Sequence, residues 1–196
     1  MSSWGELPEG ARATLDQEWR GVTARDLPSG AAVASAEGVV VAAGRNRVYD
    51  PVTAEDPLEG TALAHAELNA LARVPHGDLG ALTLWSTQRP CAMCAAAIGF
   101  VGVGRVRYLA EDPSTAARSE SSFDRRDDPV WSRVAAMLFL YTGAVLRGEA
   151  DGNLVRQAET DAALARAVLG LANGDRLGNR ARSGEPLSDV GPTMLS

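Results

Sequence analysis

The chain has 196 residues, of which 45% are hydrophobic and 22% are charged, and its formal net charge is −6. This balance is typical of a globular domain with a buried core, and no apolar run approaches the roughly 18 residues of a membrane-spanning helix. All 19 basic residues are arginine, so mechanisms that use a lysine nucleophile or a lysine Schiff base are excluded. The acidic balance also disfavours a nucleic-acid partner, because a phosphate backbone binds best to a basic surface.

The N-terminus and the cysteine content bear on location and redox chemistry. Residues 1–6 lack the basic and then apolar pattern of a signal peptide, so we expect a cytoplasmic protein with no membrane partner. The chain has only two cysteines, and they are three positions apart. Disulfide scaffolds use more cysteines at wider spacing, so this pair favours metal or redox chemistry.

Short apolar segments alternate between strand and helix patterns through the first half of the chain. In chain order they predict a helix over 15–22, strands over 31–36 and 39–43, a helix over 63–73, a strand over 82–87, a helix from Pro90 to about Gly99 and a strand over 106–109. Glu37-Gly38 is a hairpin signal between the first two strands, and the polar segment 45–60 is predicted to be a loop. This alternation predicts an α/β domain in which helices cover a sheet.

Two longer amphipathic segments follow. Apolar residues recur at helical spacing over 130–146 and again over 154–171, so each segment is predicted to be one helix. Residues 174–196 are rich in Gly, Asn, Ser and Pro and show little periodicity. We therefore predict a single domain over 1–173 and a loosely ordered C-terminal tail over 174–196.

Four residues in the middle of the chain carry the strongest chemical signal. They are His65, Glu67, Cys91 and Cys94, in the contexts His-Ala-Glu and Pro-Cys-Ala-Met-Cys. One histidine and two cysteines provide three zinc ligands and leave the fourth tetrahedral position open for water, as in a catalytic site. A carboxylate two residues after the histidine can move protons beside that water. The pattern H-x-E…P-C-x-x-C is the signature of zinc-dependent deaminases.

The predicted placement of these residues on helices supports the same interpretation. Cys91 and Cys94 are three apart, so both thiols face one way in the first turn of a helix that Pro90 opens. The positive end of the helix dipole favours the thiolate that zinc binds. Glu67 projects to a different side of its helix from His65, so we expect it to carry protons and not to be a fourth ligand.

The same residues also allow less specific interpretations. A C-x-x-C motif alone can be redox-active or structural, but thioredoxin-like chemistry leaves His65 and Glu67 without a role. A structural zinc needs a fourth protein ligand, and the only other histidine is His76, which is predicted to lie in a solvated loop. A catalytic zinc with three protein ligands is therefore the favoured prediction.

The chain resembles the cytidine deaminase superfamily from about Gly30 to Glu111, and most closely the branch of tRNA adenosine, guanine and fungal-type cytosine deaminases. The resemblance rests on Gly44-Arg45-Asn46, Ala64-His65-Ala66-Glu67, Pro90-Cys91-Ala92-Met93-Cys94-Ala95 and Gly104-Arg105-Val106. It implies a three-layer α/β/α sandwich with a five-stranded mixed sheet, a zinc cofactor and a homodimer. It also implies that Asn46 contacts the substrate base, and the position in the motif favours this role over that of a turn residue. Ala66, inside the histidine motif, becomes a second candidate for substrate binding.

The sequence departs from that branch near the motif and after it. Where the branch commonly reads Thr-Leu-Glu-Pro-Cys, this chain reads Thr87-Gln88-Arg89-Pro90-Cys91, which changes the charge beside the site. The stretch 65–71 is also similar to deoxycytidylate deaminases. After Glu111 the resemblance fades, and 114–129 shows none of the sequence that is usual there. Since this segment and the later helices would supply substrate contacts, the resemblance leaves the base open.

Three functions from different classes fit these observations. The first is a zinc-dependent hydrolytic deaminase of a small nucleobase or nucleoside, which the net charge of −6 and the apolar-faced helices favour. The second is a tRNA-specific adenosine deaminase with a basic patch near residue 120, in which carboxylates are interspersed. The residues of this mixed segment are Arg118, Asp124, Arg125, Arg126, Asp127 and Asp128. The third is a zinc-stabilised interaction domain without catalysis.

Overall fold

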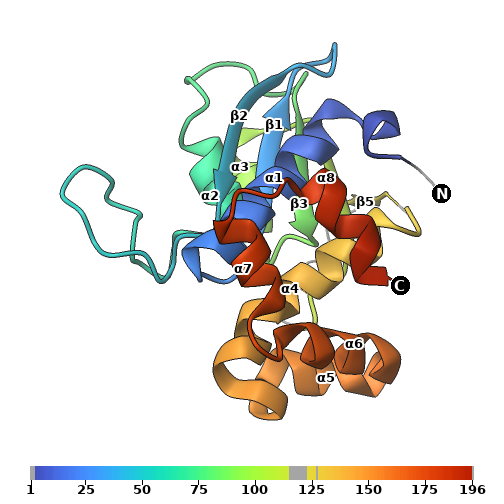
Figure 1. The fold of residues 1–196 in the computed structure, drawn as a ribbon. Helices are drawn as coiled ribbons and strands as arrows, with labels where there is room; N and C mark the ends of the chain where they lie inside the picture. Colours follow the sequence, from blue (N-terminus) through green and yellow to red (C-terminus); the bar gives the residue numbers. More distant parts are fainter. Residues whose placement is uncertain (1–2, 115–122, 127, 196) are drawn as a thin grey trace.

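A computed structural model describes residues 3–114, 123–126 and 128–195 (Figure 1). In chain order its elements, with η for a 3-10 helix, are η1 (Trp4–Glu6), α1 (Glu9–Ala24), β1 (Gly30–Ala34), β2 (Val40–Arg45), α2 (Ala66–Leu71), β3 (Thr83–Gln88), α3 (Ala92–Val101), β4 (Arg105–Ala110), β5 (Asp124–Arg125), α4 (Trp131–Arg147), η2 (Gly148–Ala150), α5 (Gly152–Thr160), α6 (Ala162–Ala172), α7 (Arg176–Arg182), α8 (Leu187–Val190) and η3 (Gly191–Leu195). The helices and strands predicted before residue 110 are all present. α1 begins at Glu9, earlier than predicted, with Pro8 as its N-cap residue.

The sheet has five strands in the order β2-β1-β3-β4-β5. β1 pairs antiparallel with β2, as the Glu37-Gly38 hairpin signal predicts, and it also pairs antiparallel with β3. β4 pairs parallel with both β3 and β5. A parallel pair needs a crossover connection, and α3 provides the one between β3 and β4. The five-stranded mixed sheet implied by the resemblance is confirmed.

Helices cover both faces of this sheet. Ala34 and Trp85 face α1 and α4, with which they form the larger hydrophobic core. Val33 and Leu84, their neighbours in sequence, face α2 and α3 on the other side. Trp85 and Trp131 are core residues, 4% and 1% exposed. The three-layer α/β/α arrangement is therefore confirmed.

The strand directions bring three strand ends to one edge of the sheet. β2 and β3 are both antiparallel to β1, so they run parallel to each other, and β3 runs parallel to β4. The residues that follow these strands are Asn46, Arg89 and Glu111. α2 and α3 begin after the N-cap residues His65 and Cys91. Ligands of α/β sheets bind beyond the carboxyl ends of strands, so this edge is where a site is expected.

α2 lies very close to β2, and Gly44 makes this possible. A Cβ atom on Gly44 would lie 2.7 Å from the backbone nitrogen of Ala70 and 2.9 Å from the backbone carbon of Asn69. Only a residue without a side chain permits such an approach. Gly44 therefore sets the distance between the sheet and the helix that carries Glu67.

The segment 154–171, predicted to be one helix, forms two. α5 ends at Thr160 and α6 begins at Ala162, with Asp161 between them. The Asp161 side chain accepts a hydrogen bond from the backbone N–H of Leu164 at 2.8 Å. An aspartate in this position caps a new helix, so the apolar spacing continues while the backbone breaks.

The prediction of a loosely ordered tail over 174–196 is wrong for the described residues. α7 and α8 pack on α1, and η3 packs on α4 (Figure 1). The indole N–H of Trp19 donates to the backbone carbonyl of Glu185 at 2.9 Å. The segment is polar in composition, but a few of its apolar residues are buried in the larger core, namely Leu177, Ala181, Leu187, Val190 and Met194. Within 3–114, 123–126 and 128–195, every helix is too short or too polar to cross a lipid bilayer.

We expect Gly44→Ala to lower the free energy of unfolding by about 1–3 kcal/mol, because the added methyl group meets backbone atoms of α2 that cannot rotate away. Gly99→Ala is the matched control. Gly99 is exposed in α3, a Cβ there meets nothing within 4 Å, and alanine is the better helix former. Urea unfolding of both variants measures the difference, and an undiminished stability of Gly44→Ala would contradict the close approach.

Candidate metal centre and active-site pocket

The three predicted metal ligands converge on one point at the sheet edge. His65 is the N-cap residue of α2, Cys91 is the N-cap residue of α3, and Cys94 is the third residue of α3. Cys91 keeps extended backbone angles, so the helix begins at Ala92 and Pro90 lies outside its first turn, which corrects the predicted start. The two thiols are nevertheless directed to the same histidine.

The separations of the ligand atoms suit zinc. The Nδ1 atom of His65 lies 3.6 Å from the sulfur of Cys91 and 3.5 Å from the sulfur of Cys94. Zn–S bonds of ~2.3 Å and Zn–N bonds of ~2.0 Å at tetrahedral angles place nitrogen and sulfur ~3.5 Å apart. These three residues form the metal-ligand group found among the described residues, and no fourth side chain of that part of the chain belongs to it. The donor set and its spacing therefore fit a tetrahedral zinc with one coordination position that no protein side chain of this group occupies.

The electrostatics of the cluster also favour a cation. Hydrogen bonds from Cys94 and from His65 lower the pKa of the Cys91 thiol to about 3. The contact with Cys91 and burial raise the pKa of the Cys94 thiol. The hydrogen bond to Cys91 raises the pKa of His65. A divalent cation bound at this point displaces thiol protons, so both sulfurs can bind as thiolates.

Glu67 lies beside the cluster without belonging to it. The hydroxyl of Ser86 donates to its Oε1 at 2.9 Å, and the thiol of Cys94 donates to its Oε2 at 3.4 Å. The side chain is 5% exposed, and burial raises the pKa of Glu67. Ser86 belongs to β3, so the sheet itself orients the carboxyl group. Sequence reasoning missed Ser86, whose only signal is its position on the strand face toward α2.

The cluster lies in the wall of a small pocket with a volume of about 160 Å³. The predicted site residues that line it are Asn46, His65, Ala66, Glu67 and Cys91. Cys94 is fully buried and is not among the lining residues. The remaining walls come from Leu27, Ser29, Gln88, Arg89, Asp112, Ser114, Phe139 and Asn153. The structure thus brings Asn46 and Ala66 to the same cavity as the metal ligands.

Asp112 is the main pocket residue that sequence reasoning missed. Its carboxyl group accepts from the backbone N–H and from the hydroxyl of Ser114, each at 2.7 Å. Burial raises the pKa of Asp112. Its place just after a parallel strand is a signal that could have identified it, because ligands bind beyond such strand ends. Asn153 comes from α5, and no local pattern predicts that this helix reaches the pocket.

Asn46 is held with its amide nitrogen toward the pocket. It is 3% exposed, and its backbone N–H donates to the carbonyl of Ser29 at 2.9 Å. Its side-chain Oδ1 accepts from the backbone N–H of Val48 at 3.0 Å. Only the oxygen of the amide can accept this bond, so the NH₂ group is the end available to a ligand. Asn46 is therefore both a turn residue and a pocket residue.

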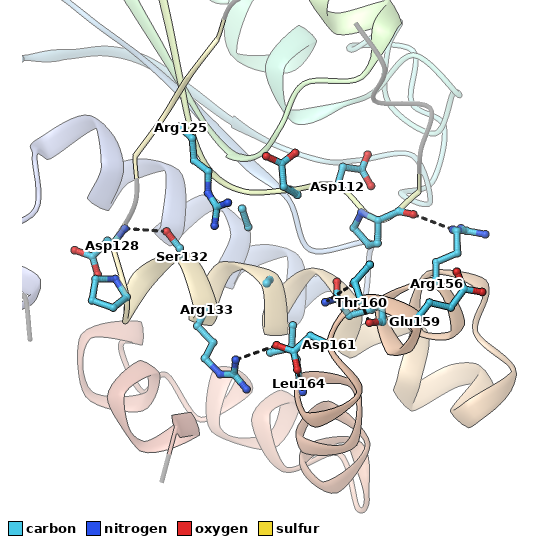
Figure 2. A pocket seen from close by; sticks show the side chains of 16 residues that line it. Asp112, Arg125, Asp128, Ser132, Arg133, Arg156, Glu159, Thr160, Asp161 and Leu164 are labelled. Carbon is cyan, nitrogen blue, oxygen red and sulfur yellow. Dashed lines mark hydrogen bonds and ion pairs between the residues drawn. The ribbon is translucent and has the colours of Figure 1, made fainter.

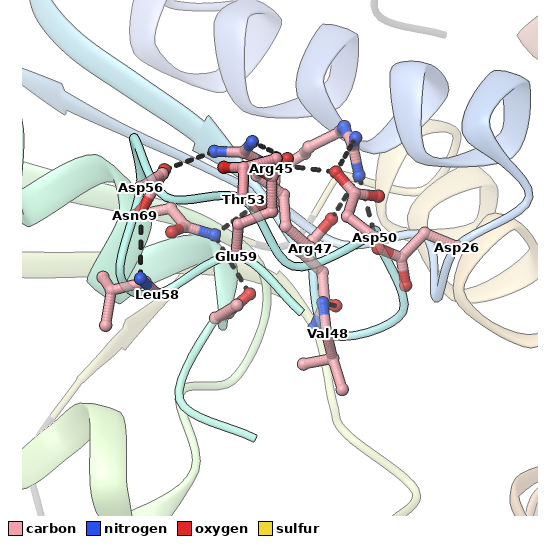
Figure 3. Close-up of polar contacts among 12 residues, drawn as sticks. Asp26, Arg45, Arg47, Val48, Asp50, Thr53, Asp56, Leu58, Glu59 and Asn69 are labelled. Carbon is pink, nitrogen blue, oxygen red and sulfur yellow. Dashed lines mark hydrogen bonds and ion pairs between the residues drawn. The ribbon is translucent and has the colours of Figure 1, made fainter. Parts of the chain in front are cut away.

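Arg45 fixes the backbone of this turn (Figure 3). Its guanidinium donates to the carbonyl of Asn46 at 2.7 Å. It also pairs with Asp26 at 3.3 Å and with Asp50 at 2.5 Å. Burial raises the pKa of Asp26 to about 6. Loss of the arginine would leave a buried carboxyl group without its counter-charge, which is costly.

Arg47 holds the rest of the polar loop 45–60 beside the turn at Asn46 (Figure 3). It pairs with Asp50 at 3.2 Å, with Asp56 at 2.5 Å and with Glu59. Its backbone N–H donates to the carbonyl of Ala64 at 2.9 Å, next to the first metal ligand. The loop over 45–60 is therefore held by ion pairs on both sides of Asn46, which makes the amide a preorganised contact.

Gln88 is oriented by a buried carboxyl group behind the pocket. Its Nε2 donates to Oε1 of Glu18 at 3.0 Å and to the carbonyl of Ala135 at 3.2 Å, while its Oε1 accepts from the hydroxyl of Thr87 at 2.6 Å. Glu18 is 0% exposed, and its Oε2 meets no hydrogen-bond donor among the described residues. Burial raises the pKa of Glu18 well above its ordinary value of 4.5, which favours the neutral acid.

Comparisons with known proteins show the family to which this chain belongs. The family model for the cytidine and deoxycytidylate deaminase zinc-binding region matches residues 9–110, which include all four motif residues. The tRNA(Ile)-lysidine synthase of Deinococcus radiodurans is 32% identical over 152 residues, which are 70% of this chain and 25% of that protein. The cytosine deaminase of Candida albicans is 29% identical over 101 residues, which are 50% of this chain and 62% of that protein. The chain thus spans a quarter and 62% of the lengths of these two relatives.

Solved structures with similar folds include the guanine deaminase from Nitrosomonas europaea. It is 25% identical to this chain, with a TM-score of 0.46, and the match covers 84% of this chain and 83% of the other.

We expect the purified protein to hold a stoichiometric amount of zinc, and Cys91→Ser and Cys94→Ser each to lose most of it, since a hydroxyl is a poor zinc ligand. His76→Ala is the control, because His76 is an exposed loop residue outside the metal-ligand group. Elemental analysis of the dialysed proteins measures the metal. A full zinc content in Cys94→Ser would contradict the assignment.

We expect Glu18→Gln to gain stability relative to the wild type as the pH rises. The pKa of Glu18 is raised in the folded state, so the wild type loses stability from pH 4.5 upward until the folded group ionises. The slope of this loss is at most about 1.4 kcal/mol per pH unit, and glutamine has none. Urea unfolding at two pH values above 4.5 measures the difference in stability between Glu18→Gln and the wild type. The exposed Glu149→Gln is the control. A pH-independent difference would contradict the buried neutral acid.

Proposed function

Because this chain belongs to the family of cytidine and deoxycytidylate deaminases, we propose that it is a zinc-dependent enzyme that hydrolyses the amino group of a small nucleobase or nucleoside. One arrangement carries the proposal: the metal-ligand group of His65, Cys91 and Cys94 lies at the wall of a pocket of about 160 Å³, which Glu67 also lines. A structural zinc has four protein ligands and needs no pocket. An open ligand position beside a pocket therefore favours catalysis over an interaction domain.

The reaction replaces an amino group on a ring carbon by oxygen. Water adds to that carbon and ammonia leaves, so one C–O bond forms and one C–N bond breaks. Zinc held by His65, Cys91 and Cys94 supplies the acidity that makes water nucleophilic near neutral pH. The chain must then hold the ring in place and move the protons.

Glu67 is the residue placed to move them. Ser86 holds its Oε1, and its Oε2 lies on the metal side, 3.4 Å from the sulfur of Cys94. From this position the carboxylate can take a proton from the attacking water and deliver it to the leaving nitrogen. Ser86 orients the carboxyl group through one oxygen, and the other oxygen remains on the metal side, which supports a role for Glu67 in proton transfer.

The pocket suits one base ring. Its volume of about 160 Å³ is below the ~300–1,000 Å³ of sites that enclose drug-sized ligands. Asn46 presents an amide N–H to an acceptor on the ring, and Asp112 adds a carboxyl group. Ala66 and Phe139 add apolar walls. A planar heterocycle with polar edges fits this combination.

The charges around the site favour a small substrate over tRNA. The pocket and the larger cavity next to it are lined, among the described residues, by four arginines and six carboxylates. These are Arg89, Arg125, Arg133 and Arg156 against Glu67, Glu111, Asp112, Asp128, Glu159 and Asp161. A phosphate backbone needs a surplus of positive charge, so an adenosine in tRNA is the weaker alternative. Of the basic patch considered for tRNA, Arg118 lies outside the described residues.

We expect Glu67→Gln to keep its zinc and to lower kcat by at least about 10²–10⁴, because it can no longer carry a proton. Ammonia release from cytosine, adenine, guanine and their nucleosides measures the activity, and the exposed Glu149→Gln is the control. Zinc-loaded wild type that turns over none of these compounds would contradict the proposal. Turnover confined to a tRNA anticodon stem-loop would favour the alternative.

A further inference from the structure

A second, larger cavity, drawn in Figure 2, adjoins the pocket that Glu67 lines. Its volume is about 610 Å³, and its walls come from the chain after β4 and from α4, α5 and α6. Asp112 lines both cavities. The two cavities are therefore neighbours, with Asp112 at their boundary.

One helix borders both cavities. α5 places Asn153 in the small pocket and Arg156, three residues later, in the larger cavity. Arg156 donates to the carbonyl of Pro113 at 2.9 Å (Figure 2). It also donates to the side-chain oxygen of Asn153 at 2.6 Å. Thr160, one turn further along α5, also lines the larger cavity. α5 is thus a continuous wall, and it lies outside the residues 9–110 that match the family.

The charge of the larger cavity limits what it can hold. Among the described residues three arginines and five carboxylates line it. Asp128 caps α4 through the N–H groups of Val130 and Trp131, at 3.0 Å each, and Asp161 caps α6 and pairs with Arg133. A phosphate would meet a surplus of negative charge there. Hydroxyl groups can instead donate to carboxylates and accept from guanidinium groups.

We propose that α5 and the larger cavity bind the sugar of a nucleoside whose base lies in the small pocket, so that nucleosides are preferred to free bases and to nucleotides. The inference rests on the proposed deaminase function, whose substrate it names. Arg156 donates to a sugar hydroxyl, while Glu111 and Asp112 accept from others, as acidic side chains commonly do with ribose. Specificity then comes from the part of the chain that the family model does not match.

The proposed sugar subsite can be tested by measuring ligand binding to the zinc-loaded Glu67→Gln protein, which does not turn the ligands over. Calorimetry with cytosine, adenine and guanine, with their nucleosides and with the nucleoside 5′-monophosphates gives the ratios of affinity. We expect at least one nucleoside to bind at least about tenfold more tightly than its base and its monophosphate, and Arg156→Met to lower the nucleoside-to-base ratio at least about tenfold. Arg166→Met is the matched control, because Arg166 is exposed on α6 and lines a separate groove with Val155 and Ala158.

Three results would overturn the inference: no nucleoside preferred to its base, a monophosphate bound most tightly, or Arg156→Met changing the ratio no more than Arg166→Met does. These results differ from failure of the proposed function. That failure is the absence of ammonia release by zinc-loaded wild type, whereas the sugar subsite is measured by binding alone.

Discussion

The meeting of one imidazole nitrogen with two cysteine sulfurs is the constraint on which this structure depends. Zinc sites tolerate deviations of only about 0.2 Å in ligand distance, yet His65 and Cys91 are 26 residues apart in the chain. The sheet brings the two ligands together, because α2 and α3 pack on the same face of it. Gly44 lets α2 lie against β2, so the helix that carries the histidine and Glu67 is held by backbone contact and not by flexible side chains.

Around this point polar groups are buried together with partners. Ser86 holds Glu67, the ion pairs of Arg45 hold the turn at Asn46, and Glu18 holds Gln88. In a medium of low dielectric each such contact is strong when satisfied and costly when broken. The donors and acceptors of the pocket are therefore oriented before a ligand arrives, which lowers the reorganisation that binding and reaction require.

The parts of the protein that could be predicted from the sequence are those set by local spacing. The hairpin and the strands depend on neighbours in sequence, and the fold agrees with them. The zinc cofactor follows from a short motif, and the family model and the group of His65, Cys91 and Cys94 agree with it. Asp112 and Asn153 reach the pocket through tertiary packing, which leaves no periodic signal. The folded C-terminal segment was missed because its few apolar residues stand in polar composition. The homodimer implied by the resemblance stays a prediction.

X-ray absorption at the zinc edge of the purified protein tests the central claim most directly. The structure predicts two sulfur ligands at about 2.3 Å and one imidazole nitrogen at about 2.0 Å, with the fourth position not taken by a side chain. That position should respond to small competing ligands added to the sample. A zinc bound by four protein side chains, or by two sulfurs without an imidazole, would contradict the account.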